Sequence, residues 1–191
     1  MILTEERFLA TYEVRRLKNK ETVKSFDCGD SDLNDFILNE SHLYRKVLLA
    51  VSYVAENKLD NYSVSAYFSL ANDKVSLNDF ESKTDFNRFR KHRFVNEKRF
   101  KSYPATNICC LVVDTSAKGL HIGSFLLDFI KSYFVINNKT GCRFLTVDAY
   151  ADAIPFYMKN GFIPLNDEDA DSDTRLLYFD LATIADDELD D

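Results

Sequence analysis

Apolar residues recur at helical spacing in three stretches of the chain, and each stretch predicts a helix. The first follows Asp30 or Ser31, either of which can cap a helix, and spans about residues 31–44. The second covers residues 124–136, and the third covers residues 151–160 and is closed by Gly161.

The other apolar runs have the length and the β-branched and aromatic content of strands. They lie at residues 8–17, 47–57, 62–72, 105–114, 142–150, 162–165 and 175–181. The second and third runs predict a hairpin, as do the last two, and the continuous run at 105–114 predicts a strand buried on both faces. A mixed sheet flanked by helices, hence an α/β fold in one domain over residues 1–191, satisfies this order.

The composition supports one folded domain. With 191 residues, 46% hydrophobic and 29% charged, the chain can fill a single core and present a charged surface. No apolar run approaches the roughly 18 residues of a membrane helix, and charges occupy the opening segment where a signal peptide needs an apolar stretch. We therefore expect a cytoplasmic protein that does not enter a membrane.

The four cysteines, Cys28, Cys109, Cys110 and Cys142, do not have the paired spacing of zinc ligands. Disulfides are rare in the cytosol, and cysteine in an apolar run behaves as a small hydrophobic residue. We expect buried thiols and no metal site.

Charge is distributed unevenly along the chain. Asn166 to Asp191 hold eleven acidic residues and one base, whereas the remaining 165 residues carry 23 bases against 20 acids, a net charge of +3. We expect the acidic end, about residues 182–191, to be a solvated tail.

The sharpest charge feature is a basic insert at about residues 79–103. Within it, Lys83 to Lys101 hold eight Lys or Arg residues with four phenylalanines between them. One interpretation is a site for a polyanion, bound by the cations and by stacking on the aromatic rings. The other is a solvated helix whose phenylalanines face the core. Phe86, Phe89 and Phe94 partly fit one helical face.

The segment DTSAKGLHIG, residues 114–123, joins a predicted buried strand to a predicted helix. In such a turn several N–H groups have no internal partner and point the same way, beside the positive end of the helix dipole. Gly119 and Gly123 allow close approach, Lys118 adds a positive charge and Ser124 adds a hydroxyl. The loop therefore predicts a phosphate site, although its glycine spacing matches neither a Walker loop nor a Rossmann fingerprint.

This loop resembles the signature Q/R-x-x-G-x-G/A of the GNAT family of N-acetyltransferases. Lys118 stands at the Gln/Arg position and Gly123 at the final glycine, while His121 replaces the middle glycine. A later segment is similar to the family's A-x-x-F-Y helix followed by K-x-G-F. The matching residues are Ala153, Phe156, Tyr157, Lys159, Gly161 and Phe162. The resemblance covers most of the chain and implies the GNAT fold.

The resemblance also implies an enzyme that uses acetyl-CoA as cosubstrate. The family's diphosphate and pantetheine contacts correspond here to Leu111, Val112, Val113, Lys118, Gly119, Leu120, His121, Ile122, Gly123 and Ser124. Tyr157 corresponds to the catalytic acid that protonates the leaving thiolate, and its hydroxyl has an ordinary pKa near 10. Asp148 is a candidate base acting through water, or else a helix cap.

The segment FDCGDSDLNDFI is similar to an opening motif of acetyltransferases related to toxins of toxin-antitoxin systems. The matching residues are Phe26, Cys28, Gly29, Leu33 and Asn34. Members of that toxin group acetylate the amino group of aminoacyl-tRNA. This subgroup implies an antitoxin partner, with a homodimer left open, and a tRNA contact through the basic insert, at Arg88, Arg90, Lys91 and Arg93.

Three functions stay open on the sequence alone. The first is N-acetylation of a primary amine on an unidentified acceptor, and the second is the same chemistry on aminoacyl-tRNA. The third is an acyl-CoA-binding or protein-interaction module without catalysis, which His121 in the loop suggests.

Overall fold

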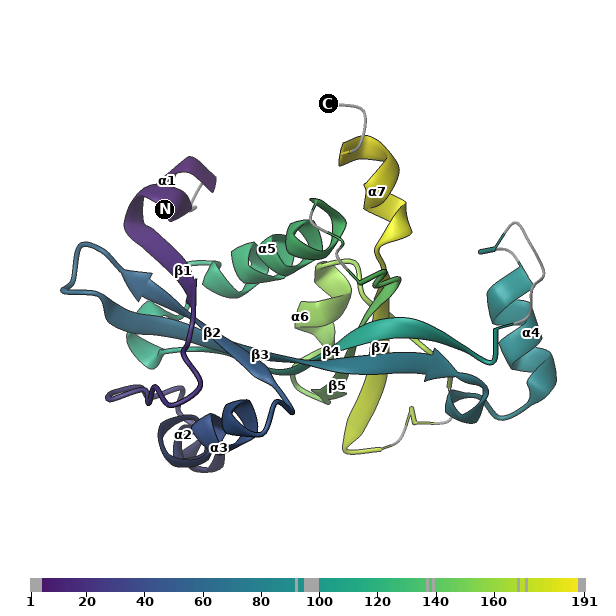
Figure 1. Ribbon diagram of the computed structural model, residues 1–191, viewed down its shortest axis with the longest axis horizontal. Coiled ribbons are helices and arrows are strands. Elements are labelled where there is room, and N and C mark those ends of the chain that lie inside the picture. The colour runs from purple at the N-terminus through teal and green to yellow at the C-terminus, as the bar shows by residue number, and fades with distance from the viewer. Residues whose placement is uncertain are drawn as a thin grey trace. The chain divides into compact units, whose positions relative to one another are not determined.

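The computed structural model describes residues 5–91, 93–94, 100–136, 138, 140–167, 169–170 and 172–188. The described chain forms a seven-stranded sheet in the order β1-β2-β3-β4-β5-β7-β6 (Figure 1). Its strands are β1 (Tyr12–Arg16), β2 (Val51–Asn57), β3 (Ser63–Ser76), β4 (Ser102–Val113), β5 (Phe144–Tyr150), β6 (Ile163–Pro164) and β7 (Thr174–Asp180). Strands β4 and β5 are parallel, and β1–β2, β2–β3, β5–β7 and β6–β7 are antiparallel.

The helices lie before, between and after these strands along the chain. They are α1 (Glu5–Thr11), α2 (Ser31–Asp35), the π-turn η1 (Phe36–Glu40), α3 (Ser41–Lys46), the 3-10 turns η2 (Leu77–Asp79) and η3 (Thr115–Ala117), α4 (Lys83–Lys91), α5 (Ile122–Ile136), α6 (Ile154–Lys159) and α7 (Ala182–Glu188). The predicted α/β class, with a mixed sheet and flanking helices, is confirmed. None of the helices in the described ranges has the length and apolarity to cross a membrane.

The chain divides into two compact units, and β3 and β4 each contribute residues to both. The first unit comprises residues 1–71 and 108–130, and the second comprises residues 72–107 and 131–191. Each unit has its own cluster of buried hydrophobic residues.

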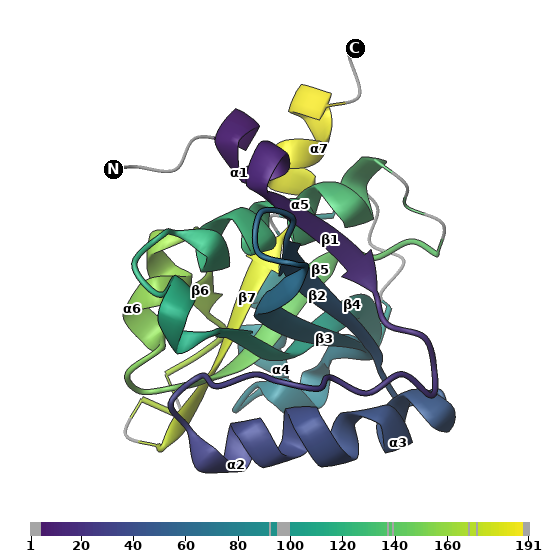
Figure 2. The same cartoon turned by 90° about the vertical axis from the view of Figure 1, so that its left-hand side faces the viewer.

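In the first unit, helices cover both faces of β1, β2 and β3. Figure 2 shows α2 and α3 running along one face of these strands, with α1 and α5 on the other side. Ile37 of η1 packs with Val54 and Tyr67 in one cluster. On the opposite face, Phe68 stacks on Tyr53 at 4.8 Å and meets Phe129 of α5 at 6.2 Å. The alternation of side chains along a strand explains why neighbours in sequence serve different layers.

In the second unit, aromatic rings form most of the core. Phe86 and Phe89 of α4 pack with Tyr103 of β4, Phe144 of β5 and Tyr178 of β7. Phe144 is fully buried and lies 5.5 Å from Phe89 and 5.8 Å from Tyr178 between ring centroids. Helix α4 is therefore fixed to the sheet by edge-on and tilted aromatic contacts.

Several predicted elements differ from the structure at their ends. Residues 8–11 belong to helix α1, so the first predicted strand begins only at Tyr12. Residues 47–50 are not strand, because the chain leaves α3 through a turn with Leu48 at φ 63°. Part of the expected acidic tail is helix α7. At these ends the surrounding structure overrides strand propensity.

The core of the second unit yields a stability prediction. Replacing Phe144 with Ala removes a fully buried ring from the aromatic cluster and should lower the free energy of unfolding by about 3–5 kcal/mol. Phe100 is 63% exposed, so Phe100→Ala should cost less than about 0.5 kcal/mol. Chemical denaturation of both variants tests this prediction. Equal losses of unfolding free energy would show that the aromatic cluster does not stabilise the second unit.

Candidate functional site

The connection between β4 and α5 is an ordered turn with two left-handed residues. Asp114 caps η3, because its carboxylate accepts hydrogen bonds from the backbone N–H and the hydroxyl of Ser116, at 2.9 and 2.6 Å. Gly119 then adopts φ 80° and His121 adopts φ 60°. A Cβ at Gly119 would meet nothing within 4 Å, so glycine is required there by the backbone angle and not by lack of space.

This turn leaves a row of backbone donors without acceptors. Within the described residues, none of the N–H groups from Gly119 to Gly123 makes a hydrogen bond, whereas Ser124 and Phe125 donate to the carbonyl oxygen of His121. The row opens a helix of 15 residues, whose N-terminus carries partial positive charge. Exposed Gly119 and His121 stand beside buried Ile122, which anchors the helix start. The arrangement suits an anion such as a diphosphate.

His121 resolves the departure from the family signature. It takes the left-handed backbone conformation that glycine adopts easily and that histidine adopts more readily than most residues. Its side chain is exposed. The turn therefore keeps a glycine-like path without a glycine.

Lys118 is used differently from what the sequence predicts. Its ammonium group donates a hydrogen bond of 2.8 Å to the carbonyl oxygen of Cys28, far away in the sequence. The lysine therefore ties the loop to the segment that precedes α2, and its charge stands beside the loop from that position.

The strand residues that precede the loop lie at the end of β4. Leu111, Val112 and Val113 are half-buried, and Val112 packs against the core cluster of the first unit. The parallel ladder of β4 with β5 joins Ala105–Asn107 to Phe144–Thr146, so these three residues lie outside it. All the predicted cofactor contacts, from Leu111 to Ser124, therefore belong to the first unit.

Tyr157 belongs to the second unit, on α6. It is 6% exposed, and its ring packs edge-on against Phe156 at 5.2 Å and Phe162 at 5.5 Å. In the same unit, Asp148 is exposed on β5, where its carboxylate accepts a 3.3 Å hydrogen bond from the side-chain amide of Asn107. Asp148 therefore does not cap α6, whose N-cap is Ala153.

Helix α4 decides between the two interpretations of the basic insert's aromatic residues. Phe86 and Phe89 are 4% and 8% exposed, and Phe94 stacks on Tyr103 at 4.1 Å. These three rings pack on the core, as the solvated-helix interpretation predicts, whereas Phe100, the fourth phenylalanine of the insert, is 63% exposed. Arg88 and Lys91 of α4 are exposed, and Arg88 also pairs with Asp85 at 3.0 Å. His92 and residues 95–99 of the insert lie outside the described residues.

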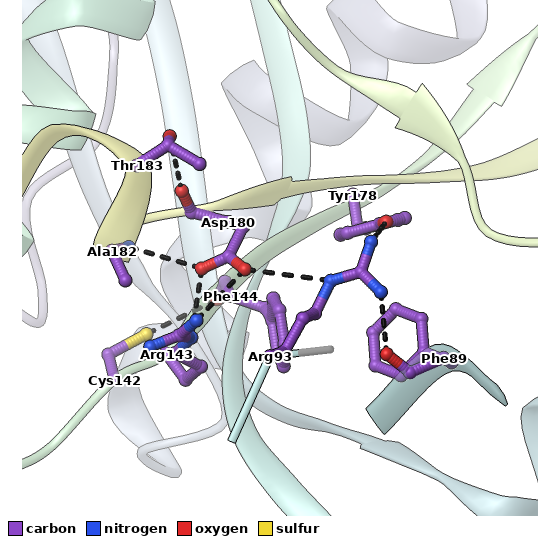
Figure 3. Close-up of polar contacts among 9 residues, drawn as sticks. All are labelled: Phe89, Arg93, Cys142, Arg143, Phe144, Tyr178, Asp180, Ala182 and Thr183. Atoms are coloured by element: carbon purple, nitrogen blue, oxygen red, sulfur yellow. Dashed lines mark hydrogen bonds and ion pairs between the residues drawn. The ribbon is translucent and has the colours of Figure 1, made fainter. Parts of the chain in front are cut away.

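Arg93 is engaged by the fold, as Figure 3 shows. Its guanidinium donates to the hydroxyl of Tyr178 at 2.5 Å and to the carbonyl of Phe89 at 2.6 Å, and lies 3.7 Å from Asp180. Asp180 also pairs with Arg143 at 2.8 Å. Burial raises the pKa of Tyr178, so this hydroxyl stays neutral near pH 7. Arg90 lies over the Phe86 ring. Of the four predicted tRNA contacts, Arg88 and Lys91 are thus the most accessible.

A cavity of about 500 Å³ lies beside this network in the second unit. Phe80, Phe89, Leu165 and Tyr178 give it apolar walls, and Arg88 and Asp167 are among its charged residues. Neither the cavity nor the role of Asp180 is predicted from the sequence. No local signal marks them, because α4, β7 and the segment near residue 165 are brought together only by the fold.

The cysteines largely follow expectation. Cys28, Cys110 and Cys142 are buried, and burial raises the pKa of Cys110 to about 12. Cys109 is exposed, so the expectation of burial is wrong for this residue and β4 is not apolar on both faces throughout. Among the residues that the structure describes, no three His, Cys, Asp or Glu side chains gather as metal ligands would.

Comparison with known proteins gives one family-model match and several structures of similar fold. Residues 93–179 match the family model described as an acetyltransferase (GNAT) domain. No curated protein sequence is similar enough to this chain to count as a relative. The fold is similar to that of a KacT variant with a tyrosine replaced by phenylalanine, with a TM-score of 0.73, 20% identity, and coverage of 92% of this chain and 98% of that one.

Two structures of a second protein are similar to the same extent. AtaT complexed with acetyl-methionyl-tRNAfMet has a TM-score of 0.72 and 21% identity, covering 91% of this chain and 96% of that one. AtaTR bound with AcCoA has a TM-score of 0.71 and 22% identity, covering 92% of this chain and 96% of that one. At these identities the structural likeness establishes the fold.

Residues 93–179 therefore match the acetyltransferase (GNAT) domain, and the described chain has the fold of these similar structures. The resemblance drawn from the loop and from the segment around Tyr157 is confirmed. The toxin subgroup indicated by residues 26–34 is also the group in which the structural neighbours fall.

The left-handed residue in the loop can be tested by its stability. Because β-branched side chains resist positive φ, His121→Val should unfold about 1–2 kcal/mol more easily than His121→Gly. Urea denaturation of the two variants measures the difference. Equal stabilities would mean that residue 121 does not adopt φ 60° in solution.

Proposed function

We propose that this chain transfers the acetyl group of acetyl-CoA to the α-amino group of an aminoacyl-tRNA. The observation that carries the acetyl-CoA part is the row of acceptor-free N–H groups from Gly119 to Gly123 at the start of α5. When bound, acetyl-CoA supplies the activated acetyl thioester. His121 was the reason to consider an acyl-CoA-binding module without catalysis. Because His121 keeps the left-handed turn, that reason no longer applies.

The cofactor contacts divide by chemistry. Backbone amides of the loop hold the two phosphates, with the positive end of the α5 dipole behind them. The backbone of Leu111 to Val113, which lies beyond the ladder between β4 and β5, would pair with the amide groups of pantetheine. Lys118 contributes mainly by holding the loop, since its ammonium is hydrogen-bonded to Cys28.

Tyr157 is the proposed acid. Transfer to an amine breaks the thioester bond, and the departing thiolate needs a proton. A tyrosine hydroxyl, with an ordinary pKa near 10, is suited to donate it and to be reprotonated by water. Asp148, exposed and hydrogen-bonded by Asn107, is the proposed base that removes a proton from the acceptor ammonium through water.

The acceptor is proposed from two observations. The similar protein AtaT has been seen complexed with acetyl-methionyl-tRNAfMet, the product of such a reaction. In this chain, α4 presents the exposed cations Arg88 and Lys91, which suit a phosphate backbone. An enzyme that uses these two substrates works in the cytoplasm. AtaT has also been seen bound to the C-terminus of the antitoxin AtaR, and we propose an antitoxin of that kind as partner.

The acid role of Tyr157 predicts a specific kinetic loss. Tyr157→Phe removes one hydroxyl and keeps the packing against Phe156 and Phe162, so kcat should fall about a hundredfold or more with acetyl-CoA affinity unchanged. Tyr150, 61% exposed on β5, is the matched control, and Tyr150→Phe should have little effect. Wild-type kcat in Tyr157→Phe would exclude the role.

The proposed tRNA-binding role of α4 predicts a salt-dependent effect. Arg88→Glu combined with Lys91→Glu should weaken tRNA binding and reduce the slope of log K against log salt by about one for each phosphate that is no longer neutralised. Lys20→Glu with Lys24→Glu makes the same charge change at exposed positions of the first unit. If both pairs weaken binding equally, the effect is one of net charge and α4 does not bind the tRNA.

A further inference from the structure

A short turn far from the loop in sequence is hydrogen-bonded to it at both ends of η3. The carbonyl of Asp27 accepts from the N–H of Thr115 at 2.7 Å, and the N–H of Asp27 donates to the Asp114 carboxylate at 2.9 Å. Beyond η3, the ammonium of Lys118 reaches the carbonyl of Cys28 at 2.8 Å. Three hydrogen bonds thus join residues 27–28 to residues 114–118, just before the row of acceptor-free amides.

The turn is itself held rigidly by one side-chain amide. The Asn34 carbonyl oxygen accepts from the N–H of Cys28 at 2.9 Å and from its thiol at 3.1 Å. The Asn34 amino group donates to the Asp27 carboxylate at 2.8 Å, and the same carboxylate oxygen accepts from the N–H of Gly29 at 2.8 Å. Asn34 therefore cross-links residues 27 and 28 from α2, and the Asp27 carboxylate extends the link to Gly29.

Gly29 shows how closely the two segments pack. It adopts φ 86°, and a Cβ built on it would lie 3.5 Å from both the Lys118 ammonium and the Thr115 methyl group. Next to it, Phe26 and Cys28 are 6% and 7% exposed and belong to the core cluster of the first unit. The core of the first unit thus holds the turn at residues 26–29, and this turn holds the β4–α5 loop.

We propose that residues 27–34 are a positioning element that holds the β4–α5 loop in its anion-binding conformation, with Asn34 and Lys118 as its key side chains. The inference rests on the proposed acetyl-CoA function of this loop. Two left-handed residues in one short loop cost free energy, and a loop that must be ordered by its ligand binds more weakly than one ordered in advance. The element removes that cost before the ligand arrives.

The role given to Lys118 differs from direct phosphate binding. A lysine that pairs with phosphate would turn its ammonium toward the ligand, whereas here the ammonium points to the Cys28 carbonyl at 2.8 Å. The two roles have different consequences in the ligand-free protein. Only the positioning role predicts that removal of the lysine loosens the loop when no ligand is present.

Two variants test the proposal by calorimetry with coenzyme A and by amide hydrogen exchange without it. Lys118→Met removes one hydrogen bond and should raise the Kd for coenzyme A about tenfold, and Asn34→Ala, which removes three, should raise it at least as much. Each should also speed exchange at residues 119–123 in the free protein. With acetyl-CoA as substrate, the effect should appear in KM more than in kcat.

The controls separate positioning from general damage. Asn39 is the matched asparagine, since its amide donates to Asp35 at 2.7 Å, away from the loop, and Asn39→Ala should change neither Kd nor loop exchange. Lys118→Arg keeps a donor for the Cys28 carbonyl and should bind coenzyme A much more tightly than Lys118→Met. Lys118 is exposed, so its variants fold even if Asn34→Ala does not.

The outcomes that overturn the proposal are distinct from failure of the proposed function. If Lys118→Met weakens binding without changing exchange in the free protein, the lysine is a direct phosphate ligand and the positioning role is excluded. Unchanged Kd and unchanged exchange in both variants would also exclude it. If the wild-type chain does not bind coenzyme A, the proposed function fails, while faster exchange in the variants would still show that residues 27–34 order the loop.

Discussion

Backbone N–H groups can face a common ligand only if the chain takes a path that denies them internal acceptors. In this protein that path runs from Gly119 to Gly123 and requires positive φ at residues 119 and 121. A loop with this path lacks the internal backbone hydrogen bonds that would stabilise its conformation, so other contacts must do so. The surrounding structure of the first unit supplies the restraint: Asp114 at the start, Lys118 in the middle, and buried Ile122 at the end.

In the second unit, the cations of the basic insert have two roles: some lie at the surface, and others form ion pairs that stabilise the fold. On α4, the aromatic residues are buried in the core, while Arg88 and Lys91 lie at the surface. Just beyond the helix, Arg93 and Arg143 both pair with the half-buried carboxylate of Asp180, and each guanidinium also lies over an aromatic ring. The positive charge that serves the fold is thereby distinct from the positive charge left for a ligand.

Much of the fold could be predicted because its periodic signals are local. The sequence predicts the helix at 124–136, which is α5, the hairpin of runs 47–57 and 62–72, which is β2 and β3, and the strand-loop-helix unit around residue 119. The ends of elements were less predictable: residues 8–11 have strand-like composition but form the end of α1, and the apolar residues 47–49 lie in an exposed turn.

The sequence predicts which residues form the loop but not the hydrogen bonds that hold the loop in place. Loop residues could be named because a short glycine-bearing turn before a helix has a known geometry. The link from Asn34 through Cys28 to Lys118 joins residues more than 80 positions apart, and nothing local signals it. The motif at residues 26–34 did indicate a family subgroup, and its structural purpose became clear only from the hydrogen bonds.

The central claim is that the amides of residues 119–123 bind the diphosphate of the acyl carrier. The most direct measurement is titration of the full chain with acetyl-CoA, followed by calorimetry and by the backbone amide resonances. The account predicts saturable binding at one site, with the largest shifts at residues 119–123. Absence of heat, or binding that leaves those resonances unmoved, would contradict it.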